Sequence, residues 1–305
     1  MIPWNEKTLL VLNPVAGHGD GEKNVQTIFD QLKTKIEKLE LISSRYPGHL
    51  VEIGKQAVLD GYRHFITIGG DGTPFELLNG LYAAEASLPS IRLAMIPAGT
   101  GNSFLRDFMD ISRPEGIIHH ILNGEIRPVD VVEFVVHNPE PEKKIFLNIL
   151  GVGLIADILK LTNEKLKGFG PLGYSLAVLI RLFKGMHNEI HLQVDGKEIE
   201  IRNSALVVSN SKYTGGKMKI APMARTDDGQ VDMVIFNGVN RRDIISIFSK
   251  VFSGRHVSHE KVNVLQGREI AIQCDPPQMV MADGELLGET PLHIRVLPKK
   301  LNLVI

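Results

Sequence analysis

Short apolar runs alternate with stretches of helical periodicity from the start of the sequence to Arg127. The runs that predict strands are Thr8–Leu12, Leu39–Ile42, His64–Ile68 and Ile91–Ile96. The stretches whose apolar residues recur at helical spacing are Lys23–Leu39, Gly48–Leu59 and Phe75–Ala84. Alternating strands and helices are typical of a parallel α/β sheet with right-handed crossovers.

After Arg127 short β-like runs dominate, and turns such as Asp195-Gly196 and Asp228-Gly229 separate them. These runs are Val129–Val136, Lys144–Ile149, Glu189–Val194, Lys197–Ile201, Ala205–Ser209, Val231–Phe236, Lys261–Leu265, Glu269–Cys274, Val280–Met281 and His293–Val296. Two helical stretches, Leu172–Phe183 and Arg242–Phe252, interrupt them, and Asn138–Lys144 is expected to be an exposed loop. This pattern predicts a largely antiparallel β-rich sandwich or barrel.

The 305-residue length fits two domains. We expect an α/β nucleotide-binding domain over residues 1–127 and a β-rich substrate domain over 128–290. Residues 291–305 are then free to return and pack on the first domain.

Composition excludes some classes of protein. With 43% hydrophobic residues, 23% charged residues and a net charge of −1, the chain reads as globular, and nothing points to a nucleic-acid partner. Cys274 is the one cysteine, which precludes an intrachain disulfide and suits a reducing cytosol. The sequence has no signal-peptide pattern and no apolar run long enough to span a membrane, so a cytoplasmic protein is expected.

Three of the predicted parallel strands end in turns rich in glycine and polar residues. These turns are Asn13–Gly21, Gly69–Thr73 and Pro97–Asn102. The carboxyl ends of parallel strands share one edge of the sheet, where ligands bind. The three turns are therefore expected to converge on one crevice.

The turn Gly69-Gly70-Asp71-Gly72-Thr73 is the strongest local signal. Glycines allow the backbone to approach a ligand closely, and successive N–H groups at a helix N-terminus bind phosphate. Asp71 would repel a phosphate, so it needs a cation beside it, which suggests Mg²⁺. The alternative is an ordinary turn whose aspartate caps the following helix.

Other motifs are weaker. No Walker-type phosphate loop is present, and Gly151–Ala156 resembles a dinucleotide fingerprint without opening a βαβ unit. His119 and His120 have no metal-ligand spacing and read as ordinary histidines. Asp227–Gln230 is either a turn or an oxygen-rich cation loop, and Asp283 is either a turn residue or a proton acceptor.

Together these motifs resemble the diacylglycerol kinase catalytic family, which is related in fold to NAD kinases and phosphofructokinases. The resemblance extends from Leu9 to Pro298. The segments that carry it are Asn13–Gly17, Ser44–His49, Gly69–Thr73, Asn79–Leu81, Gly99–Arg106, Phe146–Gly153, Lys212–Gly216, Ala221–Ala224, Asp228–Asp232 and Asp283–Glu285. Each segment alone is a weak signal, but the ordered set is specific.

The resemblance implies roles for individual residues. The positions that match nucleotide contacts are Asn13, Ser44, Gly69, Gly70, Asp71, Gly72, Thr73, Glu76 and Thr100. Arg106 matches a basic residue near the transferring phosphate, Asp283 the general base, and Glu285 a nearby nucleotide or metal contact. A Mg²⁺ site matches Asp228 with the backbone carbonyls of Arg225 and Gln230, and it is linked through water towards Asp71.

The function that the resemblance implies is ATP-dependent phosphorylation of a lipid hydroxyl, with diacylglycerol as the leading substrate, approached from the membrane surface. A homodimer is compatible with the sequence, which offers no evidence for it. Phe75 stands where the family usually has asparagine, Ala16 where serine is common and Ser103 where aspartate is frequent. Two alternatives therefore remain: a kinase for a soluble, NAD-like hydroxyl substrate, and a catalytically silent nucleotide-binding regulator.

Overall fold

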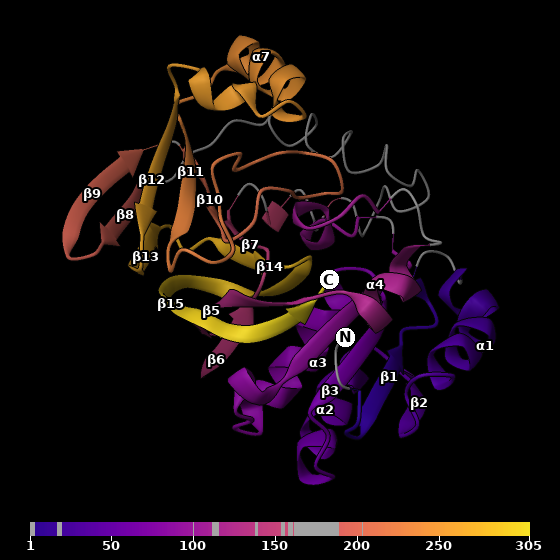
Figure 1. The fold of residues 1–305 in the computed structure, drawn as a ribbon. Coiled ribbons are helices and arrows are strands. Elements are labelled where there is room, and N and C mark those ends of the chain that lie inside the picture. The colour runs from indigo at the N-terminus through magenta and orange to yellow at the C-terminus, as the bar shows by residue number, and fades with distance from the viewer. Residues whose placement is uncertain are drawn as a thin grey trace. The chain divides into compact units, whose positions relative to one another are not determined.

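The computed structural model describes residues 4–16, 20–99, 101–111, 116–137, 140–153, 156–157, 161, 189–202 and 204–305. The chain forms two compact units, drawn in Figure 1. Unit 1 contains Met1–Val131 together with Pro298–Ile305, and unit 2 contains Val132–Leu297. The sequence had suggested domain borders after residues 127 and 290.

Unit 1 is built on a parallel sheet. Its strands are β1 (Thr8–Leu12), β2 (Leu39–Ser43), β3 (His64–Gly69), β4 (Arg92–Pro97) and the last part of β15 (Glu285–Val304). They lie in the order β2-β1-β3-β4-β15, and every neighbouring pair is parallel. The parallel α/β prediction is confirmed, and the C-terminal residues do return to this sheet.

The helices of unit 1 follow its strands (Figure 1). The described ones are α1 (Asp20–Lys33), α2 (His49–Leu59), α3 (Gly72–Ala83), α4 (Ile117–Asn123) and the short 3₁₀ helices Leu88–Ser90 and Phe104–Asp107. The first predicted helix was too long, because Leu39 pairs with β1 as the start of β2. Helix α3 begins at Gly72 rather than at Phe75, since Pro74 is tolerated in a first helical turn.

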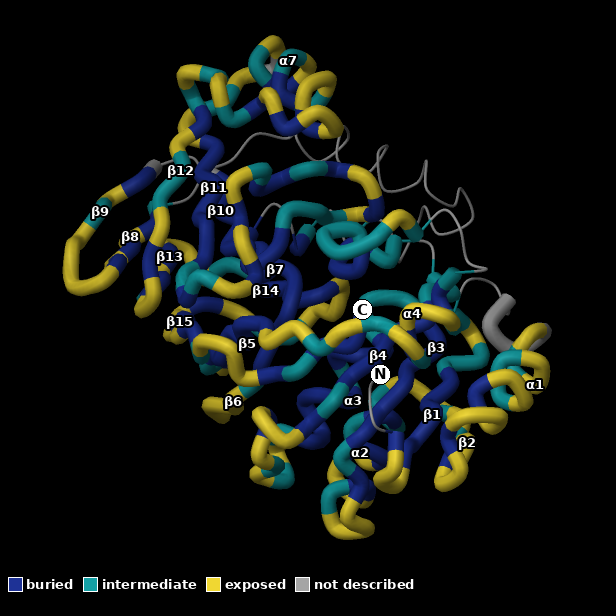
Figure 2. Tube along the Cα trace, in the orientation of Figure 1, coloured by how far each residue is buried: buried dark blue, intermediate teal, exposed yellow. Residues whose placement is uncertain are grey.

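The central strands of unit 1, β1 and β3, are buried on both faces, whereas most residues of the edge strand β2 are exposed. All residues of β1 and β3 are buried, as the dark tube of Figure 2 shows. Apolar side chains of α1 and α4, such as Leu32 and Ile121, join Leu10, Ile66 and Ile96 in one core cluster. Continuous burial explains why these strands appear in the sequence as uninterrupted apolar runs.

Unit 2 is an antiparallel β structure. Its strands are β6 (Pro141–Phe146), β7 (Ile149–Val152), β8 (Glu189–Val194), β9 (Lys197–Arg202), β10 (Ser204–Ser209), β11 (Val231–Asn237), β12 (Val262–Gly267), β13 (Glu269–Asp275), β14 (Met279–Ala282) and parts of β5 (Ile126–His137) and β15. One path runs β12-β11-β10-β7-β14-β15, and a second runs from β15 through β13 and β8 to β9. The described helices are α7 (Arg241–Val251) and the 3₁₀ helix Arg255–Ser258. The prediction of a largely antiparallel second half is confirmed.

Three details of unit 2 differ from the sequence expectations, and a fourth expectation is not tested. The expected strand Lys144–Ile149 is two strands, β6 and β7, because the chain turns between Phe146 and Ile149. The expected loop Asn138–Lys144 contains most of β6, which pairs with β5 despite its charged residues. The expected strand His293–Val296 is a short part of the long β15. The expected helix Leu172–Phe183 lies outside the described residues.

Two tight hairpins in unit 2 share one design. Asp195-Gly196 joins β8 to β9, and Asp283-Gly284 joins β14 to β15. All four residues have positive φ, which is the signature of a two-residue type I′ turn.

Gly151 lies inside β7, which agrees with the rejection of a dinucleotide-binding loop there. None of the described helices is long and apolar enough to cross a membrane.

Candidate active site

The carboxyl edge of the unit 1 sheet brings the predicted turns side by side. The N–H of Asn13 donates to Ile68 O at 3.0 Å, and the N–H of Ser44 donates to Leu12 O at 2.9 Å. On the far side of β3, the N–H of Ala98 donates to Gly69 O at 2.9 Å. The residues that follow β2, β1, β3 and β4 therefore form one continuous edge. Gly17–Gly19 and Thr100, which were assigned to the nucleotide site, lie outside the described residues.

Two of these turns touch through glycine backbone. A Cβ atom added at Gly99 would run into the Cα atom of Gly70 and would lie 3.0 Å from its nitrogen. A Cβ atom at Gly69 would collide with the side chain of Thr73. Asn102, at a positive φ of 48°, closes the second turn by donating its side-chain N–H to Gly99 O at 2.7 Å. Glycine is therefore required at Gly69 and Gly99 for steric reasons.

Asp71 ties the two turns together. Its carboxylate accepts the backbone N–H of Ser103 at 2.9 Å and of Phe104 at 3.3 Å. It makes no capping bond to its own helix α3, so the alternative of a simple helix cap does not describe its side chain. Burial raises the pKa of Asp71 above its usual value. The backbone amides of Ser103 and Phe104, the hydroxyl of Ser103 and the charge of Arg106 offset part of that rise.

Arg106 lies in the 3₁₀ helix whose first N–H groups bind Asp71. Its Nε is buried, and among the described residues no hydrogen-bond acceptor meets it. A guanidinium with an unmet donor beside a carboxylate is suited to an incoming anionic oxygen. The arrangement therefore combines a fixed carboxylate, a cation and exposed glycine backbone within one edge.

Three further residues of α3 bear on the site. Glu76 accepts the N–H of Gly48 at 3.2 Å and so links α3 to the start of α2. The Oγ1 of Thr73 is buried and has no hydrogen-bond partner among the described residues. Phe75, the departure from the family pattern, is 5% exposed and belongs to the buried hydrophobic core.

Asp283 in unit 2 is held by three consecutive backbone amides. Its carboxylate accepts the N–H groups of Leu147, Asn148 and Ile149 at 2.9, 3.0 and 2.9 Å. The residue is buried within its type I′ turn, and its own N–H donates to Ile149 O at 3.0 Å. Three N–H donors stabilise the charged form of a carboxylate, and they also fix the turn between β6 and β7.

Sequence reasoning gave no role to the polar residues on the other side of this turn. Asn210 donates its side-chain N–H to Leu147 O at 2.7 Å, and its backbone N–H donates to Asn148 O at 2.9 Å. Ser211 donates its hydroxyl to the side chain of Asn148. These residues are buried, so they form a polar network that positions Asp283. The available signal was the polar run Ser209-Asn210-Ser211 directly after an apolar strand.

The predicted metal residues lie in the loop before β11. The carboxylate of Asp228 accepts the N–H of Gln230 at 3.1 Å, while Arg225 pairs with Asp227 at 3.3 Å and is exposed. Burial and, to a smaller extent, the charge of Asp228 raise the pKa of the nearby Asp232 to about 6. Carboxylate and carbonyl oxygens suit Mg²⁺, and a cation would offset the charge that these two aspartates share, so the donor set fits the ion.

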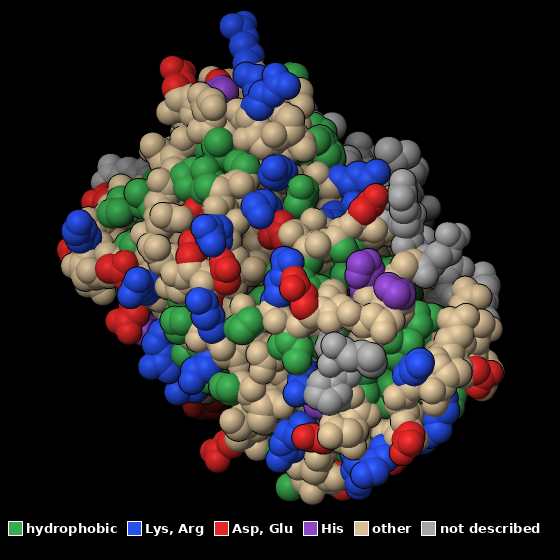
Figure 3. All heavy atoms as spheres, in the orientation of Figure 1, with side chains coloured by type: hydrophobic (Ala, Val, Ile, Leu, Met, Phe, Trp, Pro, Cys, Tyr) green, Lys and Arg blue, Asp and Glu red, His purple; other side chains and the backbone are tan. Residues whose placement is uncertain are grey.

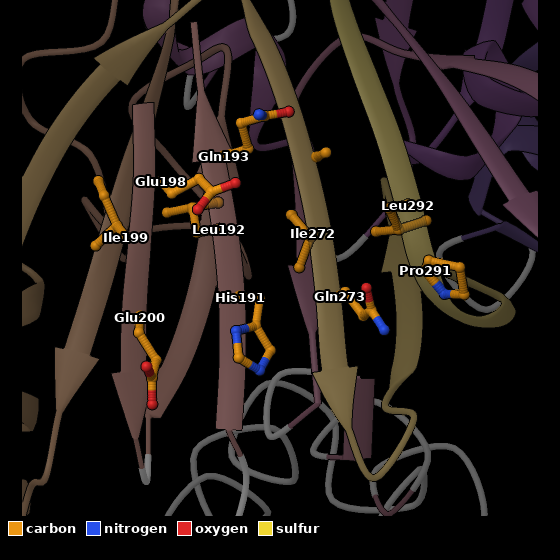
Figure 4. A pocket seen from close by; sticks show the side chains of 11 residues that line it. His191, Leu192, Gln193, Glu198, Ile199, Glu200, Ile272, Gln273, Pro291 and Leu292 are labelled. Atoms are coloured by element: carbon orange, nitrogen blue, oxygen red, sulfur yellow. The ribbon is translucent and has the colours of Figure 1, made fainter. Parts of the chain in front are cut away.

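Unit 2 also contains Glu285 and a hollow that is lined by other residues. Glu285 is exposed at the first position of β15, two residues after Asp283. A hollow of about 600 Å³ lies against β8, β9, β13 and β15, and Figure 4 shows His191 and Glu200 beside it on neighbouring strands. None of its lining residues is a predicted site residue. His119 and His120, which had no metal-ligand spacing, are both exposed on α4.

The comparisons with known proteins cover nearly the whole chain. Residues 7–134 match the diacylglycerol kinase catalytic domain, and residues 148–305 match the YegS C-terminal NAD kinase beta sandwich-like domain. A protein named diacylglycerol kinase from Bacillus subtilis is 24% identical, covering 94% of this chain and 92% of its own length. One of the same name from Mycobacterium tuberculosis is 25% identical, covering 98% and 94%.

The solved structures agree. The crystal structure of a putative diacylglycerol kinase from Bacillus anthracis superposes with a TM-score of 0.80 at 25% identity, covering 98% of this chain and 95% of that one. Two domain matches in the expected order, with a shared fold over almost the full length, exclude a chance likeness of single motifs. The chain belongs to the diacylglycerol kinase catalytic family with a YegS-type C-terminal domain, and it is a phosphotransferase that uses an alcohol group as acceptor.

Proposed function

We propose that this protein transfers the γ-phosphate of ATP to the hydroxyl group of a membrane lipid, with diacylglycerol as the substrate. The observation that carries the proposal is the edge where Asp71, Arg106 and the glycine backbone of two turns meet. Phosphoryl transfer requires positioning and charge neutralisation more than covalent chemistry, and this edge supplies both. Relatives named diacylglycerol kinase support the acceptor.

The nucleotide binds at the turns of unit 1 in this proposal. Gly69, Gly70 and Gly72 leave backbone N–H groups accessible to the phosphates at the start of α3. Asn13 and Ser44 lie on the neighbouring turns at the same edge and extend the contact surface. Arg106 places its unmet Nε donor towards a phosphate oxygen and offsets its charge.

A divalent cation is the third component of the proposed ATP site. Mg²⁺ is the proposed ion, which would be held by Asp228 and the carbonyls of Arg225 and Gln230 and would supply charge neutralisation for the transferring phosphate. Asp71 is the second carboxyl group of the proposed site; burial raises its pKa, and a cation beside it would favour its charged form. Its two amide bonds hold the carboxylate in one orientation, so it is preorganised for a metal- or water-mediated contact.

The acceptor hydroxyl is activated by Asp283 in the proposal. The three amide bonds hold this carboxylate in one orientation, in which it accepts the hydroxyl proton as the bond to phosphorus forms and the bond from phosphorus to ADP breaks. Glu285, exposed two residues later, is the proposed nucleotide or metal contact beside it. Asn210 and Ser211 act through Asn148 to hold the turn that carries the amides.

Two alternatives are weighed against this proposal. The silent regulator rests on Phe75, a side chain that is buried at 5% exposure, whereas the residues proposed for catalysis, Asp71, Arg106 and Asp283, are all present. A kinase for a soluble NAD-like substrate shares the unit 1 turns, and the two readings differ in the acceptor alone. Membrane lipids require the protein to visit the membrane surface, whereas a soluble acceptor does not.

The test is an acceptor panel. Purified protein is incubated with γ-labelled ATP, Mg²⁺ and mixed micelles that each carry one hydroxylated lipid, with NAD and glycerol as soluble controls. Label in diacylglycerol is the expected result, and Asp71→Ala abolishes it. Label only in NAD or glycerol overturns the lipid assignment, and binding of ATP without any transfer identifies a silent regulator.

A further inference from the structure

Helix α7 carries a second apolar stripe besides the one that faces the core. Ile244, Ile247 and Val251 are buried. Ile245 and Phe252, two helical turns apart, are 60% and 48% exposed, whereas Phe248 between them is half-buried and packs against the core cluster. The rings of Phe248 and Phe252 meet edge to face with centroids 5.8 Å apart. A surface helix needs one buried stripe, so the second one requires a separate explanation.

The loop before β11 extends this apolar surface. The N–H of Lys219 donates to Val251 O at 3.0 Å, which fastens the loop to the end of α7. A Cβ atom at Gly254 would lie 3.0 Å from the side chain of Pro222, so the loop and the helix end are in contact. The next residue, Met223, is 39% exposed. We call Ile245, Phe248, Phe252 and Met223 the α7 face.

Basic residues border the α7 face. Arg242 lies one turn before Ile245, Arg255 lies three residues after Phe252, and both are exposed. Within the described part of the chain no ion pair engages either of these two cations. Figure 3 shows Lys and Arg side chains over α7, with acidic and His side chains near them.

Acidic charge is turned away from the α7 face. Asp243 is the one acidic residue between Arg241 and Ser258, a segment that contains four basic residues. Its carboxylate is committed to Lys261 at 2.7 Å and to the capping box of α7, about half a helical turn from the apolar stripe. The α7 face is therefore apolar at its centre and positive at its rim.

We propose that the α7 face is the surface through which this protein docks on an anionic lipid bilayer. Exposed Ile and Phe side chains on an in-plane helix, bordered by Arg side chains that make no ion pair within the described residues, match the chemistry of a bilayer interface with negative headgroups. A second copy would bring an identical basic rim to the same face, and like charges oppose that contact. The proposal rests on the proposed lipid kinase function and names where that enzyme meets its substrate's membrane.

A reporter at Phe252 tests insertion directly. In Phe252→Trp the emission is followed while vesicles of phosphatidylcholine with or without phosphatidylglycerol are added. Trp4, the chain's one tryptophan, is buried and gives a constant baseline. We expect a blue shift and quenching by brominated lipid with anionic vesicles. Leu59→Trp, at a position that is 78% exposed on α2, is the matched control and stays unshifted. An unshifted Phe252→Trp overturns the proposal.

Substitutions test the contribution of each part. The double variant I245S/F252S is expected to bind phosphatidylglycerol vesicles roughly tenfold more weakly, since two inserting side chains are lost. R242E/R255E is expected to lose at least as much and to lose the salt dependence of binding. L59S is the control and binds as the wild type does. If I245S/F252S keeps its vesicle affinity but shifts a monomer–dimer equilibrium in sedimentation, the α7 face is a contact between copies and the proposal is wrong.

Kinase assays separate this proposal from the proposed function. A short-chain diacylglycerol, presented as dissolved monomers, is expected to be phosphorylated equally by wild type and I245S/F252S. The same variant is expected to be roughly tenfold slower on diacylglycerol within phosphatidylglycerol vesicles. Equal rates on vesicles overturn the docking face while the kinase stands. Vesicle binding through Phe252 without transfer to any lipid removes the proposed function and leaves the docking face in place.

Discussion

The two units hold their candidate catalytic carboxylates by opposite means. In unit 1 the backbone N–H of Ser103 holds Asp71. The two turns come this close because neither Gly99 nor Gly70 has a side chain at their contact. In unit 2 Asp283 is fixed by a buried set of polar side chains, including Asn210 and Ser211, that pins one turn. The first arrangement leaves open N–H groups for a ligand, whereas the second is satisfied internally. The contrast indicates a nucleotide edge in unit 1 and an oriented proton acceptor in unit 2.

The largest expected effect is on the chemistry at Asp71. Asp71→Asn keeps the shape of the side chain and removes its charge, so roughly 1000-fold of kcat is expected to be lost. Steady-state transfer from labelled ATP measures it, and circular dichroism confirms that the variant is folded. A kcat within a factor of ten of wild type contradicts the role given to Asp71.

The next effect concerns the contact between glycine turns. Gly99→Ala places a Cβ atom against Gly70, so the turns separate, and roughly 100-fold in kcat/KM is expected to be lost. Gly61→Ala is the matched control, because its φ is +80° but nothing lies within 4 Å of the added atom. The control changes stability by about 1 kcal/mol and leaves kcat/KM unchanged. Equal kinetic effects at both glycines would show that close approach is not required.

Stability distinguishes the two ways of holding an aspartate. Asp283→Asn turns an amide group towards backbone N–H donors in a buried site, so about 2 to 4 kcal/mol of unfolding free energy is expected to be lost. Asp195→Asn is the matched control, since that residue sits in the same type of turn and accepts the N–H groups of Arg268 and Glu269 at an exposed site. The control is expected to lose less than about 1 kcal/mol. Urea denaturation measures both, and equal losses would show that burial of the network is unimportant.

The smallest effect is a pH dependence of stability in unit 2. Burial lowers the pKa of His256, whose Nε2 contacts Ile220 O at 3.0 Å. Because the folded pKa lies below the unfolded value of about 6.5, this stability contribution is present above that pH and is lost as pH falls through the folded pKa. The melting temperature of His256→Phe is therefore expected to fall less between pH 7 and pH 5 than that of wild type. Parallel melting curves would contradict it.

Much of unit 1 was predictable from the sequence because its determinants are local. A buried strand such as His64–Ile68 is continuous in the sequence, and the glycines that follow it mark a tight approach wherever they occur. Parallel topology then places the turns at one edge without further information. The sequence did not reveal that Asp71 bonds to Ser103 and Phe104, because that contact joins residues more than thirty positions apart.

Unit 2 was less predictable because its determinants are distant. The network at Asp283 joins the turn after β6, the end of β10 and the hairpin between β14 and β15. Asparagine and serine at strand ends are common turn residues, so Asn210 and Ser211 gave no signal beyond that of an ordinary turn. The sequence pattern predicted only a short strand, His293–Val296, where the structure has the long β15. Exposed polar positions alternate with buried ones along this half-solvated strand, so most of it has no continuous apolar run.

The most direct measurement is transfer of label from γ-labelled ATP to diacylglycerol in phosphatidylglycerol vesicles, with wild type and Asp71→Asn run side by side. We expect the wild type to form labelled phosphatidic acid in a Mg²⁺-dependent reaction and the variant to form roughly 1000-fold less. Labelled lipid formed at the same rate by both proteins, or no labelled lipid from the wild type with any hydroxylated lipid, would contradict the assignment.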